Sequence, residues 1–94
     1  MKKSYKHLVH YALDRGHTVS VFDGEEWQVK RSDVASNIFD AIESVEGETI
    51  RIRNQDGAVT AWAYIIPGLA NDETVADYSD NAFMQAWSDN FATN

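Results

Sequence analysis

Three histidines near the N-terminus are the side chains of this chain best suited to metal binding or acid–base catalysis. His7 and His10 are three residues apart, so on a helix both would face the same side and could share one metal ion. No third ligand stands at a suitable spacing, and the H-E-x-x-H pattern is absent. The simpler interpretation is that His7, His10 and His17 are solvated side chains in and just after a helix.

Other catalytic and metal-binding patterns are also missing from the sequence. It contains no G-x-S-x-G motif, no phosphate-binding glycine loop and no G-x-G-x-x-G motif. Asp77, Asp80 and Asn81 have a loop-like spacing, but the glycine and the closing glutamate of a calcium-binding EF-hand loop are lacking. There is no cysteine, which excludes disulfides and thiolate metal sites. We therefore predict a non-enzymatic protein that requires no metal and no cofactor.

The charge of the chain is large and unevenly placed. Its net charge is −7; residues 1–53 hold eight Lys and Arg against nine Asp and Glu, whereas residues 54–94 hold none against six. Such a chain is repelled at long range by nucleic acid and by anionic membranes and is attracted to basic surfaces. We expect a partner protein with a basic surface, no direct binding of nucleic acid and no membrane association.

The elements that must position these charges follow from hydrophobic periodicity. Apolar residues at helical spacing predict a helix over residues 4–15, which Ser4 is placed to cap. Alternation around an Asp-Gly turn predicts a hairpin in "TVSVFDGEEWQVK", and a second hairpin follows in "TIRIRNQDGAVTAWAYII". Between them, a helix starts at Ser32 or Asp33, with Val34 in its apolar stripe, and ends near Gly47.

The last third of the chain is predicted to hold one long loop and one helix. Residues 68–78 form the loop, which can include a helical turn. Ser79 or Asp80 then caps a helix in which Phe83, Trp87 and Phe91 recur every four residues.

These elements predict one α+β domain over residues 1–94, in the order α-β-β-α-β-β-α. The two hairpins would form a four-stranded, mainly antiparallel sheet with the helices packed on one face, in an undetermined strand order. The predicted core consists of Trp27, Ile50, Ile52, Ile38, Ile42, Leu8 and Phe83.

The uncovered face of such a sheet is one candidate binding surface. If Ile50 and Ile52 face the helices, Arg51 and Arg53 face away from them. The same face would carry Phe22, Trp62 and Tyr64, with Ser20, Gln28 and Lys30 beside them. Aromatic rings among arginines are typical of single-strand nucleic-acid platforms, but also of cross-strand cation–π packing, and the net charge favours the second interpretation. This face could instead serve a regulatory or structural interaction module, including a homodimer.

The acidic residues form the other candidate surface. Asp33, Asp40 and Glu43 lie on the predicted second helix, and Asp89 lies on the last one. Glu73, Asp77 and Asp80 would stack at i, i+4 and i+7 if their segment is helical. The simpler interpretation is that these acidic side chains keep the protein soluble. The sharper hypothesis is that carboxylates spaced ~5–6 Å apart imitate the phosphates of DNA.

Two segments of the chain, "TVSVFDGEEWQVKRS" and "WAYIIPGLANDETVADYSDN", resemble a small family of uncharacterised bacteriophage and prophage proteins. The resemblance extends from residue 8 to residue 90 and implies no reaction. It implies a setting, the bacterial host cytoplasm during infection, which agrees with the lack of an apolar signal sequence or membrane span.

Together these observations lead to one functional hypothesis. The protein would be a phage-encoded inhibitor that binds a host nucleic-acid-handling or defence protein, such as a CRISPR effector, restriction complex or nuclease. The two acidic segments each follow a hairpin, so the fold can bring them together into one partly DNA-mimicking surface.

Overall fold

Helices and strands follow one another closely along the chain in the computed structural model, which describes residues 3–44, 47–70 and 73–93. In chain order they are α1 (Ser4–Asp14), β1 (Thr18–Phe22), β2 (Trp27–Ser32), α2 (Ala35–Glu43), β3 (Glu48–Arg53), β4 (Val59–Ile65), β5 (Val75–Tyr78) and α3 (Ala82–Thr93). The α+β class is confirmed. The predicted element order is wrong at one point, because a fifth strand stands before the last helix.

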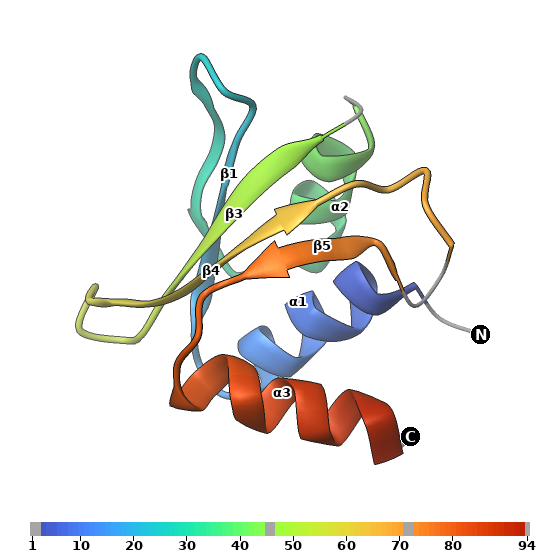
Figure 1. Cartoon of the computed structure of the whole chain (residues 1–94). Helices are drawn as coiled ribbons and strands as arrows, with labels where there is room; N and C mark the ends of the chain where they lie inside the picture. Colours follow the sequence, from blue (N-terminus) through green and yellow to red (C-terminus); the bar gives the residue numbers. More distant parts are fainter. Residues whose placement is uncertain (1–2, 45–46, 71–72, 94) are drawn as a thin grey trace.

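The strands form one antiparallel sheet in the order β2-β1-β3-β4-β5. Behind this sheet lie α1 and α2, and α3 runs along its lower end, so that the helices share one face (Figure 1). The first helix lies between the other two and contacts both of them. Among the described helices, none combines the length and the apolar composition needed to cross a bilayer.

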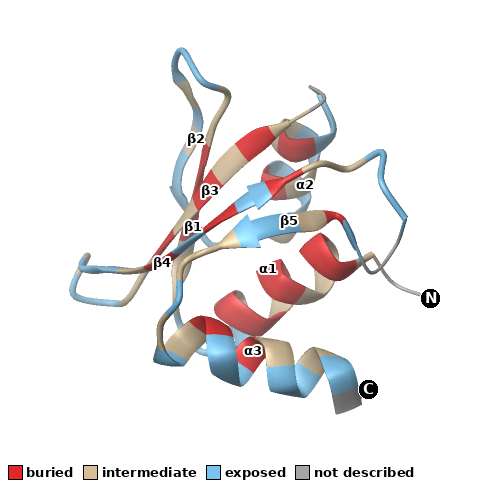
Figure 2. Ribbon diagram, in the orientation of Figure 1, coloured by how far each residue is buried: buried red, intermediate tan, exposed pale blue. Residues whose placement is uncertain are grey.

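The core lies between the sheet and the helices. Alternate residues of the three central strands point into it, and the red segments in Figure 2 mark where it is buried. From the strands it contains Val19, Val21, Ile50, Ile52, Ala61, Ala63 and Ile65. The helices add Tyr5, Leu8, Val9, Tyr11, Ala12, Ile38, Ile42, Met84 and Trp87.

Three of the residues expected in the interior lie elsewhere. Trp27 is only half-buried and pairs with Phe22 on the uncovered face, because the register of β2 shifts between Val29 and Trp27. Phe83 is partly buried at the margin of the core. Val34 is 46% exposed, because α2 begins one residue after it and turns its side chain to solvent.

The segment predicted as a long loop contains β5, which pairs with β4 through Ala63–Tyr78 and Tyr64–Asp77. A buried hydrogen-bond network anchors the start of this strand to α1. The hydroxyl groups of Ser4 and Thr74 are 2.7 Å apart, and the backbone N–H of Tyr5 donates to Thr74 Oγ1 at 3.0 Å. The backbone N–H of Val75 donates to Ser4 Oγ at 3.2 Å.

This network also changes how the helices are capped. Lys3 is the N-cap residue of α1 and makes no capping hydrogen bond, so that Thr74, distant in sequence, satisfies a first-turn donor instead of Ser4. In α3, Asn81 Oδ1 accepts from the backbone N–H of Met84, so Asn81 takes the role expected of Ser79 or Asp80.

Glu48 is a buried carboxylate on the helix-facing side of β3. Its residue is 1% exposed, and neither carboxylate oxygen has a hydrogen-bond partner within the described structure. Burial, together with the charge of nearby Asp23, raises the pKa of Glu48 from 4.5 to about 7. Asp23 itself stays ionised, because the backbone N–H groups of Glu26 and Glu25 hold its pKa below the ordinary value.

We predict that Thr74→Val destabilises the protein by about 1–3 kcal/mol, because it leaves the Tyr5 N–H and the Ser4 hydroxyl without their buried partner. Thr60→Val is the matched control. Thr60 Oγ1 is buried with no partner in the described structure, so its removal should leave stability unchanged or raised. Urea unfolding measures both, and equal losses in the two variants would contradict the anchoring role of Thr74.

We also predict that Glu48→Gln stabilises the protein in a pH-dependent way. The folded state holds the Glu48 proton more tightly than the unfolded chain, so wild-type stability is retained below pH 4.5 and lost as pH rises through about 7. The variant should therefore gain about 3 kcal/mol over wild type at alkaline pH and little in acid. Thermal unfolding measured across this pH range gives the answer, and a gain independent of pH would refute the assignment.

Candidate functional site

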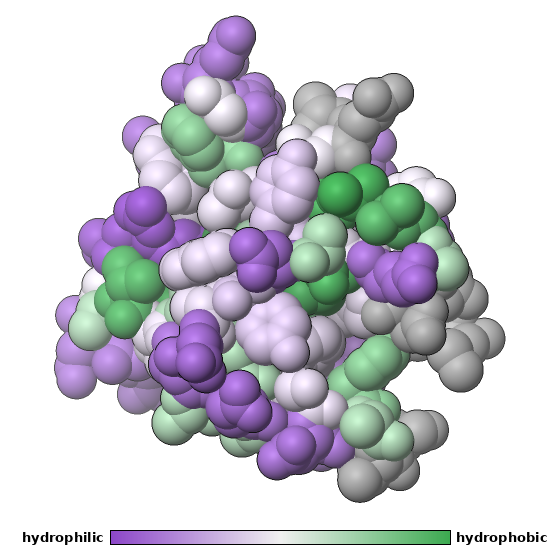
Figure 3. Space-filling model, in the orientation of Figure 1, coloured by the Kyte–Doolittle hydropathy of each residue, from purple (hydrophilic) through white to green (hydrophobic). Residues whose placement is uncertain are grey.

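The face of the sheet that the helices leave uncovered carries a concentrated set of chemically active side chains. The strand register aligns Ser20, Arg51 and Trp62 in one row across β1, β3 and β4. A neighbouring row contains Phe22, Thr49, Tyr64 and Asp77. In the space-filling view of this face, hydrophilic side chains extend across it and strongly apolar atoms are confined to separate patches (Figure 3).

Within this face, four cationic side chains surround one cavity of about 230 Å³. We call it the cationic cavity, and its lining consists of Ser20, Trp27, Lys30, Arg31, Arg51 and Arg53. The cations come from β2 and β3, which are not adjacent in the sheet; β1 separates them and contributes only the small Ser20 at this point. The long side chains therefore converge above β1.

The walls of the cationic cavity are held by specific contacts. The guanidinium of Arg51 lies over the Trp27 ring at 4.9 Å, and the Trp27 and Phe22 rings are 5.0 Å apart. Arg53 donates from Nη1 to the backbone carbonyl of Gly57 at 2.8 Å. These contacts orient the two arginines and leave most of their N–H donors available to a ligand.

Arg31 occupies a strained backbone position in the same cavity. Its φ is +49°, the only positive value at a non-glycine residue in the described chain. The register between β1 and β2 shifts here, which places Lys30 and Arg31 in a bulge. The Arg31 N–H donates to the buried Ser20 Oγ at 2.8 Å, so that Ser20 stabilises the bulge. Strain of this kind occurs mainly at functional positions.

The four cations of the cavity have no carboxylate within ion-pair distance in the described parts of the chain. There, the one ion pair joins Lys6 to Glu43 at 3.5 Å. Tyr5 also donates a hydrogen bond to Glu43, which lowers the pKa of that carboxyl group. Burial, with this bond as a smaller contribution, raises the pKa of the Tyr5 hydroxyl. Lys6 of α1 is thus paired with a carboxylate, whereas the cations that line the cavity are held only by uncharged groups within the described residues.

The predicted sheet-face residues are brought together by the fold. Arg51, Arg53 and Phe22 lie in or beside the cationic cavity, and Trp62 and Tyr64 lie next to it, 39% and 40% exposed. Gln28, expected on this face, instead lines a groove on the other side of β2. Lys30, expected on this face, does line the cationic cavity. Sequence reasoning missed the roles of Trp27 and Arg31.

The predicted acidic residues are dispersed. Glu73, Asp77 and Asp80 do not share one helix, because the chain forms β5 at Val75–Tyr78; the condition for their stacking at helical spacing is therefore not met. Asp77 lies on the open face beside Tyr64, and Asp80 accepts a hydrogen bond from Gln85 before α3. Asp33 and Asp40 are exposed at α2, and Asp89 is exposed on α3. Because α1 separates these helices, the two acidic segments do not meet.

The histidines pack against aromatic rings at the helix surfaces. His7 Nδ1 accepts a hydrogen bond from Trp87 Nε1 at 3.0 Å, which fixes α3 on α1. The His10 ring contacts Phe39, and the His17 ring contacts Phe83. Among the described residues, no group of three or more His, Asp or Glu is placed to hold a metal ion.

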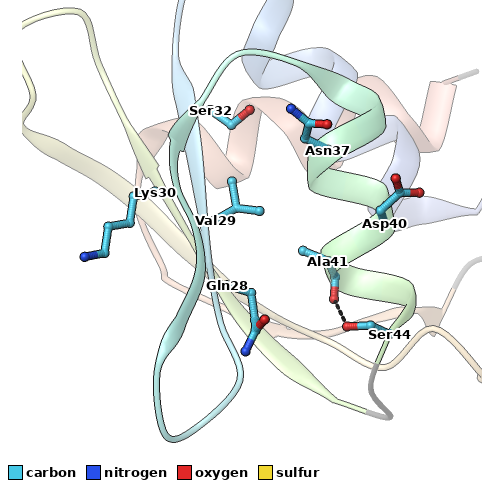
Figure 4. A pocket seen from close by; sticks show the side chains of 8 residues that line it. All are labelled: Gln28, Val29, Lys30, Ser32, Asn37, Asp40, Ala41 and Ser44. Atoms are coloured by element: carbon cyan, nitrogen blue, oxygen red, sulfur yellow. Dashed lines mark hydrogen bonds between the residues drawn. The ribbon is translucent and has the colours of Figure 1, made fainter.

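A second and larger concavity lies between α2 and the edge strand β2. It encloses about 670 Å³ and is lined by Gln28, Val29, Lys30, Ser32, Asn37, Asp40, Ala41 and Ser44. Figure 4 shows Val29 and Asn37 pointing into it, while Lys30 extends away from α2 toward the opposite side of the strand. This groove contains both charges and amides but no converging set of like groups, so the cationic cavity is the stronger candidate.

No family model, curated protein or solved structure matches this chain. The candidate site therefore rests on its own geometry.

We predict that Arg31→Gly stabilises the protein by about 0.5–1 kcal/mol, because glycine adopts positive φ without steric cost. Lys30→Gly, one residue earlier in the same bulge, has no positive φ to relieve and should destabilise by a similar amount. Urea midpoints of the two variants decide the question. Equal destabilisation in both would show that Arg31 is not strained.

Proposed function

We propose that the protein is a non-enzymatic binding protein that acts through the open face of its sheet. One observation carries the proposal. Of the seven described Lys and Arg side chains, four surround a single cavity on the face that the helices leave uncovered, and none of the four has a carboxylate partner there.

The physical argument is that this clustering has no use in folding. Like charges at short range repel one another, and dispersing them among the many carboxylates of the chain would stabilise the folded state. Arginine and tryptophan are also the side chains most enriched where binding energy concentrates. Strain at Arg31 supports the same conclusion, because it keeps a cation in the cavity at a cost in stability.

The chemistry of the cavity supports binding in preference to catalysis. Its side chains supply hydrogen-bond donors and positive charge, and its hydroxyl group, from Ser20, is buried and already accepts from the Arg31 N–H. Among the described residues that line it, none is a histidine or a carboxylate that could act as a base.

The partner must carry negative charge where it meets this face. A symmetric dimer whose twofold axis passes through the cationic cavity would set the four cations of one copy against the same four of the other, which is electrostatically unfavourable. We therefore favour a different molecule over a second copy of this chain.

A second candidate function is the acidic inhibitor of a host nucleic-acid-handling or defence protein. The observation in its favour is that Asp33 and Asp40 are exposed at α2 and have no ion pair in the described structure. This surface is short, because Glu43 is paired with Lys6, Asp77 lies on the open face in β5, and α3, which carries Asp89, lies on the other side of α1. DNA mimicry stays a prediction with less geometric support than the sheet face.

One experiment separates the two surfaces. The tagged protein is used to capture partners from a bacterial lysate, the source that the resemblance to phage proteins indicates, and is compared with two matched double variants. Arg51→Ala with Arg53→Ala should abolish capture of the specific partner, whereas Asp33→Asn with Asp40→Asn should leave it intact. The reverse pattern would refute the sheet-face proposal and favour the acidic surface.

A further inference from the structure

Two flat aromatic side chains lie exposed beside the cationic cavity. Trp62 and Tyr64 are two residues apart on β4, so their rings leave the same face of the sheet about 7 Å apart. Together they expose ring surface that the helices leave uncovered. Successive bases of an extended strand can stack on rings arranged in this way.

The cations are placed to bind the backbone of the same strand. Arg51 is the direct cross-strand neighbour of Trp62, at a separation of about 5 Å between such residues. Arg53, Lys30 and Arg31 continue from Arg51 across the cavity toward β2. A strand with a base on Trp62 therefore has its phosphate within reach of several guanidinium N–H donors.

The net charge of −7 is spread over the molecule, and the repulsion that its distant carboxylates exert at the open face is weakened by screening. Exposed charges are screened over ~8 Å at physiological ionic strength. The molecule is 22 Å thick along its shortest axis, and α2, which carries Asp40, lies behind the sheet. The local charge of the cationic cavity is therefore what an approaching anion meets at short range. Asp77, beside Tyr64, is a carboxylate on the same face that opposes it. Glu26 and Asp56 adjoin the cavity in sequence, next to Trp27 and to the Gly57 whose carbonyl accepts from Arg53.

From these observations we infer that the ligand of the open face is a single-stranded nucleic acid. Its phosphate occupies the cationic cavity, and its bases stack on Trp62 and Tyr64. A duplex does not fit this arrangement, because its bases are paired and stacked on one another and cannot reach the rings. An acidic protein segment would use the arginines but would gain little from two flat, exposed rings. The inference rests on the proposed function of the open face and names its ligand class.

The test is fluorescence anisotropy with labelled oligothymidine and oligouridine of about ten nucleotides, at salt concentrations between about 50 and 200 mM. We expect binding that weakens as salt rises. Trp62→Ala should weaken it about 5- to 100-fold, whereas Trp62→Phe, which keeps a ring, should retain most of it. Arg51→Ala with Arg53→Ala should weaken binding and flatten its dependence on salt. Comparison of the two oligonucleotides shows whether the sugar hydroxyl contributes.

Two further variants provide matched controls for charge. Asp77→Asn removes the carboxylate beside Tyr64 and should tighten binding, whereas Asp40→Asn, on the helix side, should leave it unchanged. Equal effects of the two would mean that only net charge matters and would overturn the inference.

Failure of the inference is distinguishable from failure of the proposed function. If a labelled oligoglutamate binds with the same dependence on Arg51 and Arg53 while the oligonucleotides do not, the open face is a protein-binding surface and the nucleic-acid assignment is wrong. If Trp62→Ala binds oligonucleotide as well as wild type does, stacking is absent and the inference is likewise overturned.

Discussion

A single layer of helices can bury only one face of a sheet, and this constraint governs the rest of the molecule. The chain has 94 residues, enough for three helices against five strands. The central strands β3 and β4 therefore alternate between a buried apolar side chain and a more exposed one on the open face, as Ile50, Arg51 and Ile52 do in β3. Whatever stands at the outward positions is free of the demands of the core, and here those positions hold arginine and large aromatic side chains.

The period-two and period-3.6 patterns were sufficient to predict three helices, two hairpins and the α+β class. They could not predict β5, whose four residues, Val-Ala-Asp-Tyr, are too few and too polar to stand out. Its pairing with β4 and the contact of Thr74 with α1 are long-range interactions that define it only in the folded state. The failure mattered for function, since a strand at this point removes the helical row of Glu73, Asp77 and Asp80.

Only part of the candidate site was predictable from the sequence, because local patterns assign residues to a face of a strand but do not show which strands are neighbours. Alternation placed Arg51, Arg53, Trp62 and Tyr64 on one face, because that inference needs only the local strand period. Lys30 was also expected there, but its convergence with Arg31 and the arginines of β3 on one cavity follows from β1 lying between β2 and β3, and strand order is not encoded in local sequence. The bulge that turns Trp27 outward and gives Arg31 its positive φ is a further feature that simple alternation does not predict.

The charge of the protein is therefore better described by its distribution than by its total.

The three tryptophans allow the central claim, that the open face binds the ligand, to be tested in one measurement. Their indole N–H groups give separate NMR signals, and Trp87, bonded to His7, lies on the helix side as an internal reference. On titration with oligothymidine, we expect the signals of Trp62 and Trp27 to shift while that of Trp87 does not. A titration that moves the Trp87 signal and leaves the other two in place would contradict the account.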